Sequence, residues 1–378
     1  MGLIITPQAD IDAYFASEAT NQSSLKNLEG GLGGFMANLA KNKKDLEENK
    51  PTPDYFLVGG AVDCILTGEK GEFEKQYYVS NLTKMPSEVE IKIVESVFNE
   101  LANADMLDQV NYGDCYDSIL AAADSVKNGD KIGWQNNWKA DTRVAKLIIA
   151  GLEYFDDLKA SFGLKIISSE MRENIDRIVN SLKFNAKTKK YFDRDLQADQ
   201  EHMDFYYQLP MYFTYKGVEC KALMDLVVVH KNPKGEIIRI EPIDLKTMSG
   251  NTLQFTGKVK QHRYDIQAAW YTMALAKHFD FPEEKIDPFK FVVESTTGVG
   301  TPLVFEITPQ TLIHGKEGAP EGWFISDNGE RDLYYPARKG FEELMAEYIF
   351  YQEQGFKEDI IFEKYPDVIL IDWLKGIV

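Results

Sequence analysis

The sequence predicts an α/β protein in which a mixed central sheet with an antiparallel meander is flanked by helices and follows a mostly helical N-terminal region. Three observations lead to this prediction. Apolar residues recur with the helical period through most of the chain up to residue 183. Three neighbouring segments rich in Tyr, Phe, Val and Ile follow, at 205–216, 218–230 and 236–247. An amphipathic helix is then expected over 260–279.

The N-terminal region is expected to consist of helices joined by short links. The first helix begins at Ser23 or Ser24, because either hydroxyl can cap a helix, and the glycines over 30–34 end it. The charged stretch 41–53 is expected to be a surface link. Further helices are expected at 55–66, 86–128, 138–160 and 168–183.

Tight turns are expected between the three strands, because 216–217 and 232–235 contain the glycine, proline and asparagine that such turns favour. After the helix over 260–279, the pattern predicts strands at 289–294 and 302–307, a helix at 337–353 and an apolar tail at 367–378. We therefore predict three parts: a helical N-terminal region over 1–160, a core over 161–325, and a C-terminal helix and tail over 326–378.

Composition limits the class of protein. The chain has 378 residues, of which 44% are hydrophobic, which is enough for a sizeable core. No run of about 18 apolar residues is present, so no membrane span is expected, and residues 1–14 do not have the pattern of a secretory signal. Cys64, Cys115 and Cys220 are few and widely spaced, which fits buried thiols in a reducing compartment.

The net charge of −18 weighs slightly against a nucleic-acid partner, because such proteins usually have a basic surface. It does not exclude one, since a local basic groove can lie on an acidic body.

Chemistry is concentrated between residues 219 and 247. Asp225 interrupts an apolar strand, and Asp244 and Lys246 lie two apart on the next strand, so they point to the same face. The short hairpin between these strands brings two carboxylates and an ammonium to one patch of the sheet. Carboxylates are rarely buried unless they are paired or bind a metal.

Two carboxylates at this spacing suit Mg²⁺, which prefers oxygen ligands and keeps several waters. Such a metal would polarise a phosphodiester and lower the pKa of a bound water. Lys246 could orient or deprotonate that water and stabilise negative charge, and the Thr247 hydroxyl could contact a phosphate or a metal-bound water.

A simpler interpretation of Asp244-x-Lys246 is a surface ion pair on a solvated strand. The acid-x-Lys pattern is common, and this chain repeats it at 48–50, 90–92, 157–159 and 283–285. None of these four follows an Asp-bearing apolar strand through a tight hairpin. Asp225 therefore favours the catalytic interpretation.

The helix after the meander adds polar residues near this patch. Gln267 and Tyr271 are four apart and therefore share one helix face, and a basic stretch that ends at Arg263 precedes them. These residues could hold a phosphate or a base. They could also be ordinary polar residues at the edge of an amphipathic helix, since Gln208 and Tyr212 have the same spacing.

Three motifs in this order resemble the RecB-like branch of the PD-(D/E)XK nucleases, and within it the RecE-type and lambda-type phage and prophage exonucleases. They are Gly217-Val-Glu-Cys-Lys-Ala-Leu-Met-Asp225, Asp244-Leu-Lys-Thr247 and Gln267-Ala-Ala-Trp-Tyr271. Ser23-Ser-Leu-Lys26 is also similar to the opening helix of the family, and Gly59-Gly-Ala-Val-Asp63 to its early helix. The resemblance covers about residues 20–310 and is dense only over 217–271.

The resemblance implies a restriction-endonuclease-like core and a role for each matching residue. Asp225 and Asp244 would bind Mg²⁺ or Mn²⁺, with Asp63 as a further ligand where many relatives have a histidine, and Lys246 would be the catalytic lysine. Gln267 and Tyr271 would contact DNA near the scissile phosphate or steady the site. The expected DNA contacts also include Thr247, Arg263 and Lys221, although Lys221 could instead cover the sheet. Gln208 lies near the place of a family glutamate and is counted only as a neighbour of the site.

The same resemblance implies a metal-dependent exonuclease that digests linear double-stranded DNA from an end for recombination. It implies a homo-oligomer, a single-strand annealing partner, no membrane, and the cytoplasm of a bacterial cell as the place of action, with the cell or a phage as source. Two alternatives stay open: a structure-specific or single-strand endonuclease, and a non-catalytic DNA-binding protein that retains the fold.

Trp134 and Trp138 are also four residues apart. Their rings could stack on bases or pack into the core.

Overall fold

The computed structural model describes residues 2–38, 53–129, 131–325, 331–335, 337–357, 371–372 and 376–377. The chain divides into two compact units, and each is described here by itself. Unit 1 comprises residues 1–44, 67–69 and 181–378, and unit 2 comprises 45–66 and 70–180. The stretch predicted as a link over 41–53 and most of the predicted tail lie outside the described residues.

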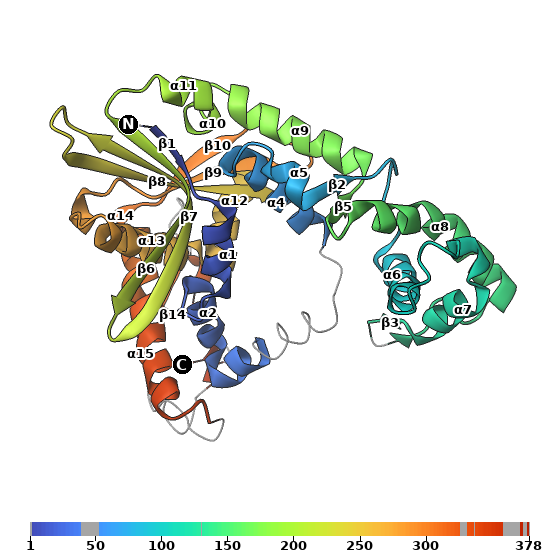
Figure 1. The fold of residues 1–378 in the computed structure, drawn as a ribbon. Helices are drawn as coiled ribbons and strands as arrows, with labels where there is room; N and C mark the ends of the chain where they lie inside the picture. Colours follow the sequence, from blue (N-terminus) through green and yellow to red (C-terminus); the bar gives the residue numbers. More distant parts are fainter. Residues whose placement is uncertain are drawn as a thin grey trace. The chain divides into compact units, whose positions relative to one another are not determined.

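Unit 1 is built on a six-stranded mixed sheet with the order β1-β6-β7-β8-β9-β10 (Figure 1). The strands are β1 (Gly2–Ile5), β6 (Met203–Tyr215), β7 (Val218–Lys231), β8 (Ile237–Met248), β9 (Lys290–Ser295) and β10 (Leu303–Glu306). The three long strands β6, β7 and β8 form the antiparallel meander that the sequence predicts. Strand β8 is parallel to β9, and β1 is parallel to β6. The sheet confirms a mixed α/β fold.

The turn between β6 and β7 requires an unusual backbone. Lys216 and Gly217 both have positive φ, at 50° and 83°. Two consecutive residues of this kind match the twist of an antiparallel hairpin, and glycine adopts positive φ without steric cost. This turn sets the register that places Cys220 opposite Phe213.

Helix α13 (Tyr264–His278) packs on the sheet against β6 and β7. The sequence predicts one amphipathic helix over 260–279. The structure has two helices, α12 (Phe255–His262) and α13, separated by Arg263 with φ 54°. All ten residues from 266 to 275 are buried, so the prediction of an amphipathic helix was wrong. Helix α14 (Pro309–Glu317), which also packs against α13, helps to bury this helix.

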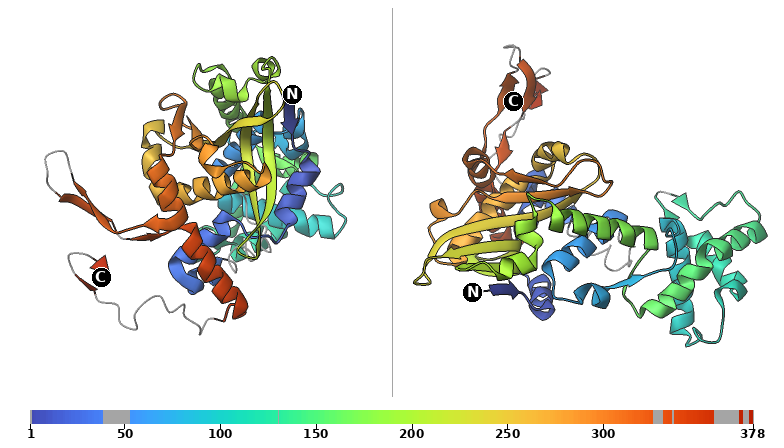
Figure 2. Two further views of the ribbon diagram at one scale, coloured as in Figure 1. Left: turned by 90° about the vertical axis from the view of Figure 1, so that its left-hand side faces the viewer. Right: turned by 90° about the horizontal axis from the view of Figure 1, so that it is seen from above.

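The remaining helices of unit 1 complete its layers (Figures 1 and 2). They include α1 (Gln8–Ala16), α2 (Gln22–Lys26), α10 (Lys189–Phe192), α11 (Arg194–Ala198) and α15 (Phe341–Glu353), and residues 31–38 are also helical. Helix α2 packs against α13 and α15, and Tyr191 of α10 reaches β8 through its hydroxyl. The core between these helices and the sheet includes the fully buried Trp270.

Unit 2 is mainly helical (cyan to green in Figure 2). Its larger helices are α4 (Asp54–Thr67), α6 (Glu88–Asn103), α7 (Tyr116–Ser125), α8 (Ala140–Ser161) and α9 (Ser169–Phe184), the first and last of which run on into unit 1. The helix predicted over 86–128 is divided into α6 and α7. The core contains residues of α6, α7 and α8 such as Val94, Ile119 and Phe155. No helix among the described residues is long and apolar enough to span a membrane.

Helices α13 and α14 approach closely at Gly315. A Cβ atom added there would lie 2.1 Å from the backbone oxygen of Asp265, so any side chain must push the two helices apart. We expect Gly315→Ala to lower the free energy of unfolding by about 1–3 kcal/mol, measured by urea unfolding. Gly257→Ala on α12 is the matched control, because a Cβ there meets no atom within 4 Å; it should raise stability by up to about 1 kcal/mol. Equal stability of both variants would contradict the close helix contact.

Candidate active site

The candidate site lies where strands β7 and β8 separate. The two strands are paired as far as Leu226 and Ile243. The next residues are Asp225 on β7 and Asp244 on β8, and from here β8 continues along β9. One carboxylate oxygen of Asp225 accepts a hydrogen bond from the backbone N–H of Leu245 over 2.7 Å. The Asp225 side chain therefore bridges the two strands beyond their last backbone pair.

Asp244 and Lys246 form an ion pair in which the carboxylate is buried and the lysine side chain is 22% exposed. Nζ of Lys246 lies 2.6 Å from Oδ2 of Asp244, and Asp244 is only 2% exposed. The side-chain amide of Gln267 donates a hydrogen bond to Oδ1 of Asp244 over 2.7 Å. Asp244 and Lys246 thus lie on the same face of β8, and Gln267 of α13 binds the aspartate through its side-chain amide.

The site is shaped by burial and by opposed charges. Burial raises the pKa of the Asp244 carboxyl, and the Lys246 ammonium opposes this shift. Burial by itself lowers the pKa of Lys246, but the charges of Asp244 and Asp225 outweigh it and keep that pKa above its ordinary value. Nζ of Lys246 also lies 5.1 Å from the ring centroid of Tyr264. Lys246 is therefore charged at neutral pH, in a position to stabilise negative charge beside the carboxylates.

Lys26 is a neighbour of this site that the sequence did not indicate. It ends helix α2, and its ammonium donates a hydrogen bond to the backbone oxygen of His262 over 3.2 Å. Burial, together with the charge of Lys246, lowers the pKa of Lys26 to about 8, against the opposing charges of Asp265 and Asp244. Lys26 belongs to the Ser-Ser-Leu-Lys motif, but this motif was used only to predict the start of a helix.

Tyr271 lies one turn after Gln267 on α13 and is buried, at 8% exposure. Burial raises its pKa well above the ordinary value, and the charges of Asp244 and Asp225 act in the same direction. Of the Gln-x-x-x-Tyr motif, Gln267 contacts Asp244 directly, and Tyr271 is buried within reach of the charges of both carboxylates. The role of the two residues in DNA binding or in steadying the site stays a prediction.

Two residues predicted to contact DNA are engaged in the fold instead. Lys221 is 5% exposed, and its ammonium donates hydrogen bonds of 2.7 Å to the backbone oxygens of Tyr14 and Ser17 at the end of α1. A cation at this position stabilises the C-terminal end of a helix. Lys221 thus covers the sheet, which was the alternative interpretation of this residue.

Arg263 is 3% exposed and lies between α12 and α13. Its guanidinium pairs with Glu29 and Asp265 and donates to the backbone oxygen of Lys339 over 2.7 Å. We therefore leave Arg263 and Lys221 out of the proposed DNA contacts. Thr247, which follows Lys246 on β8, is half-buried and stays a predicted contact.

Gln208 stands across from Asp225, because it lies between the pairs Tyr207–Leu226 and Leu209–Met224. Its φ of 52° is uncommon for a residue other than glycine, and such conformations cost on the order of 1–3 kcal/mol. Its side-chain amide donates to the hydroxyl of Thr67 over 2.8 Å. The strained backbone of Gln208 therefore lies next to Asp225, in agreement with the prediction that Gln208 is a neighbour of the site.

The donor set fits a magnesium ion held by two carboxylates. Mg²⁺ is commonly bound by one or two carboxylates together with waters and substrate phosphates. Oδ2 of Asp244 accepts no well-aligned hydrogen bond among the described residues and is paired with the Lys246 ammonium over 2.6 Å, so a metal ion at this oxygen would share it with Lys246. The described residues contain no group of three or more His, Cys, Asp or Glu side chains arranged for a metal. Asp63 lies on α4 in unit 2, and its part as a ligand stays a prediction.

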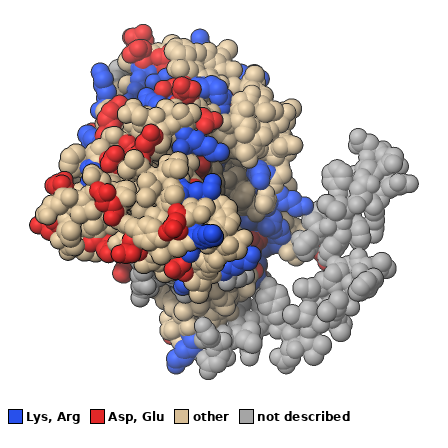
Figure 3. Space-filling view, turned by 90° about the vertical axis from the view of Figure 1, so that its right-hand side faces the viewer, with Lys and Arg blue, Asp and Glu red and all other residues tan. Residues whose placement is uncertain are grey.

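Charge is unevenly distributed over the surface. On the face in Figure 3, acidic side chains gather toward the left, whereas Lys and Arg side chains form a band toward the right. A net charge of −18 is thus compatible with local basic areas, and such areas can attract an anionic ligand to an acidic protein.

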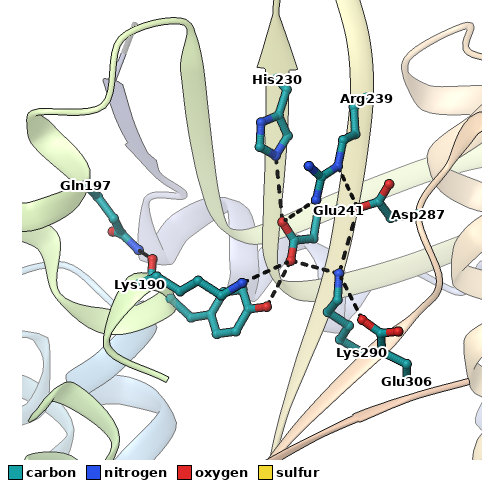
Figure 4. Close-up of polar contacts among 9 residues, drawn as sticks. Lys190, Gln197, His230, Arg239, Glu241, Asp287, Lys290 and Glu306 are labelled. Atoms are coloured by element: carbon teal, nitrogen blue, oxygen red, sulfur yellow. Dashed lines mark hydrogen bonds and ion pairs between the residues drawn. The ribbon is translucent and has the colours of Figure 1, made fainter. Parts of the chain in front are cut away.

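The opposite face of β8 contains a second buried carboxylate, that of Glu241, three residues before Asp244 (Figure 4). Its partners are Lys290 at 2.9 Å, the Tyr191 hydroxyl at 2.9 Å, Arg239 at 3.4 Å, His230 at 3.7 Å and Lys190 at 4.0 Å. Burial alone would raise the pKa of Glu241, but these partners hold it well below its ordinary value. We call this group the Glu241 cluster; it joins β8 to β7, β9 and α10.

Comparisons with known proteins leave the family open. No protein-family model matches the chain, and no curated protein matches it significantly. Among solved structures, the chain is similar to a protein from Eubacterium rectale provisionally described as an exonuclease, with 17% identity and a TM-score of 0.28 over 59% of this chain and 76% of the other. A TM-score this low does not establish a shared fold, so the function is argued from the geometry of the site.

Proposed function

We propose that this chain is a metal-dependent nuclease of the PD-(D/E)XK type that hydrolyses phosphodiester bonds in DNA. The observation that carries the proposal is the ion pair of the buried Asp244 with Lys246 at the point where β7 and β8 separate, with Asp225 hydrogen-bonded to the backbone N–H of Leu245 next to it. Asp244 is buried, whereas Asp225 and Lys246 are partly exposed. Burying a carboxylate is unfavourable unless a partner or a metal ion compensates its charge.

Each residue then has a defined part. Asp225 and Asp244 would hold Mg²⁺ or Mn²⁺, which when bound supplies a Lewis acid and lowers the pKa of a bound water. Lys246 would stabilise the charge that develops on the phosphate. Gln267 keeps Asp244 in its orientation through the 2.7 Å hydrogen bond, as partners of metal ligands commonly do.

The resemblance to the RecE-type and lambda-type enzymes supports a more specific proposal. In it, the enzyme digests linear double-stranded DNA from an end, forms a homo-oligomer and acts with a single-strand annealing protein in the cytoplasm of a bacterial cell. An endonuclease acting on single strands or on special structures is the alternative within the same chemistry.

The decisive experiment is digestion of end-labelled linear duplex and closed circular duplex in Mg²⁺, Mn²⁺ or chelator. We expect loss of the linear substrate in either metal, an intact circle, and no reaction in chelator. Cutting of the circle would show that the enzyme is an endonuclease and not an exonuclease. Binding without hydrolysis in both metals would overturn the proposed activity and indicate a DNA-binding protein.

Lys26 is expected to contribute to substrate binding. The charges of Lys26 and Lys246 interact, and we propose that the Lys26 ammonium contacts a DNA phosphate next to the site. We expect Lys26→Ala to raise KM about tenfold, since a hydrogen bond to a charged group contributes about 1.5–3 kcal/mol, with little change in kcat.

The pH dependence gives a second readout for Lys26. Its pKa of about 8 means that the lysine is charged below pH 8 and loses its charge above it, so DNA affinity of the unmodified protein should fall as pH rises through 8. Lys26→Arg keeps its charge and should remove this dependence. The control is Lys285→Ala, an exposed lysine that should leave KM unchanged. An unaltered KM in Lys26→Ala would exclude this role.

A further inference from the structure

We propose that a shallow cavity in unit 2, lined by Trp138, Lys139, Thr142 and Lys146, binds one base and one phosphate of single-stranded DNA. The cavity has a volume of about 270 Å³, slightly below the roughly 300–1,000 Å³ of drug-sized sites, which suits a single nucleotide. The choice of DNA as the ligand rests on the proposed nuclease function. The inference that the ligand has an aromatic base and a phosphate rests on the residues that line the cavity.

The two tryptophans before α8 have different environments. Trp134 packs against the hydrophobic core of unit 2, so core packing is confirmed for this residue. Trp138 is partly buried, as Trp134 is, but it lines the cavity. Their rings are 5.8 Å apart between centroids, at an angle of 71°. Trp134 therefore supports the ring of Trp138 from the core, and an aromatic surface is left at the cavity.

Positive charge surrounds this aromatic surface. The ammonium of Lys146 lies 5.5 Å from the ring centroid of Trp138, and Lys139 is the residue that precedes the first turn of α8. None of the four lining residues is acidic. The nearest acid along the chain, Asp141, accepts a hydrogen bond from the Tyr116 hydroxyl over 2.7 Å. Two exposed lysines thus flank one tryptophan on a protein with a net charge of −18.

This combination matches the chemistry of a nucleotide in a single strand. An unpaired base can stack on an indole ring, and lysines beside the ring can bind the adjoining phosphate. The Thr142 hydroxyl can donate a further hydrogen bond to phosphate. The contact of Lys146 with the ring is weak at an exposed site, so a base and a phosphate can replace it. In a duplex the base faces are already stacked on their neighbours, and the cavity therefore selects single strands.

The test is binding of a fluorescent oligothymidylate of about 12 nucleotides to the full chain in chelator, where no hydrolysis can occur. We expect Trp138→Ala to weaken binding about tenfold and Trp138→Phe to retain most of the affinity, because phenylalanine keeps a stacking surface. Lys139→Ala and Lys146→Ala should each weaken binding and reduce the slope of log affinity against log salt by about 0.7, the value for one phosphate contact in a single strand.

Controls separate this site from other effects. Lys84→Ala removes an exposed lysine of the same unit that does not line the cavity, and it should change neither affinity nor salt slope. Thermal unfolding of each variant excludes loss of structure as the cause. Affinity of Trp138→Ala within twofold of the unmodified protein, or equal salt slopes for the lysine variants and Lys84→Ala, would overturn the proposal. Hydrolysis of duplex DNA in Mg²⁺, measured in parallel, reports the proposed nuclease function separately.

Discussion

Replacing Asp244 by asparagine is expected to lower Mg²⁺-dependent DNA hydrolysis by on the order of 10³-fold. The loss of a metal ligand removes several kcal/mol of transition-state stabilisation, and it also leaves the Lys246 ammonium without its partner at 2.6 Å. The measurement is the initial rate of release of acid-soluble nucleotide from linear duplex at saturating Mg²⁺. Gln267→Leu should have a smaller effect of about 10–100-fold, because Gln267 orients the aspartate and is not itself a proposed ligand.

Loss of folding must be distinguished from loss of catalysis in this experiment. Asp244→Asn takes away the ion-pair partner of Lys246, so this variant will be less stable. The loss should be smaller than the cost of about 3–5 kcal/mol for breaking a fully buried pair, because the Lys246 side chain is 22% exposed and the charge of Asp225 also acts on it. The double variant Asp244→Asn with Lys246→Met removes both charges and should recover much of the stability without recovering activity. Hydrolysis at the unmodified rate by either variant would show that these residues are not the catalytic centre.

The sequence predicted the meander and the meeting of Asp225, Asp244 and Lys246 because both are local properties. Alternation of apolar residues defines the strands, short hairpins define which strands are neighbours, and a spacing of two places side chains on one face. None of these depends on distant parts of the chain. The structure therefore agrees with the sequence most closely over 203–248.

The features that were not predicted depend on distant segments. Strand β1 lies in a region expected to be helical, and it is held by parallel pairing with β6 about 200 residues later. Helix α13 is buried all round because it packs against both the sheet and α14. Arg263 was expected to contact DNA, but its partners Glu29 and Lys339 lie far away in the sequence. The spacing of apolar residues within one helix does not indicate which distant segments of the chain pack against it.

Removal of the buried carboxylate at Glu241 is expected to be the most destabilising single change in the sheet. Glu241→Ala leaves Lys290, which is 6% exposed, without its partner at 2.9 Å, and it also removes the acceptor of the Tyr191 hydroxyl. Lys290 keeps two longer pairs, with Glu306 at 3.7 Å and Asp287 at 3.8 Å, so the loss should not exceed the cost of about 3–5 kcal/mol for an unpaired buried charge. Urea unfolding at pH 7 should show this loss. Glu306→Gln is the matched control, because the Glu306 side chain is 58% exposed at 3.7 Å from the same lysine, and exposed pairs contribute at most about 1 kcal/mol.

The pH dependence of Glu241→Gln tests the origin of this stability. The folded protein holds the pKa of Glu241 well below its ordinary value of 4.5, so the ionised carboxylate stabilises the fold above pH 4.5 and this contribution is lost as pH falls below it. The difference in unfolding free energy between the unmodified protein and Glu241→Gln should narrow as pH falls below 4.5. Because Glu241 lies on the opposite face of β8 from Asp244, the folded variant should still hydrolyse DNA. A stability difference that is independent of pH down to 3 would show that the Glu241 cluster acts through packing and not through charge.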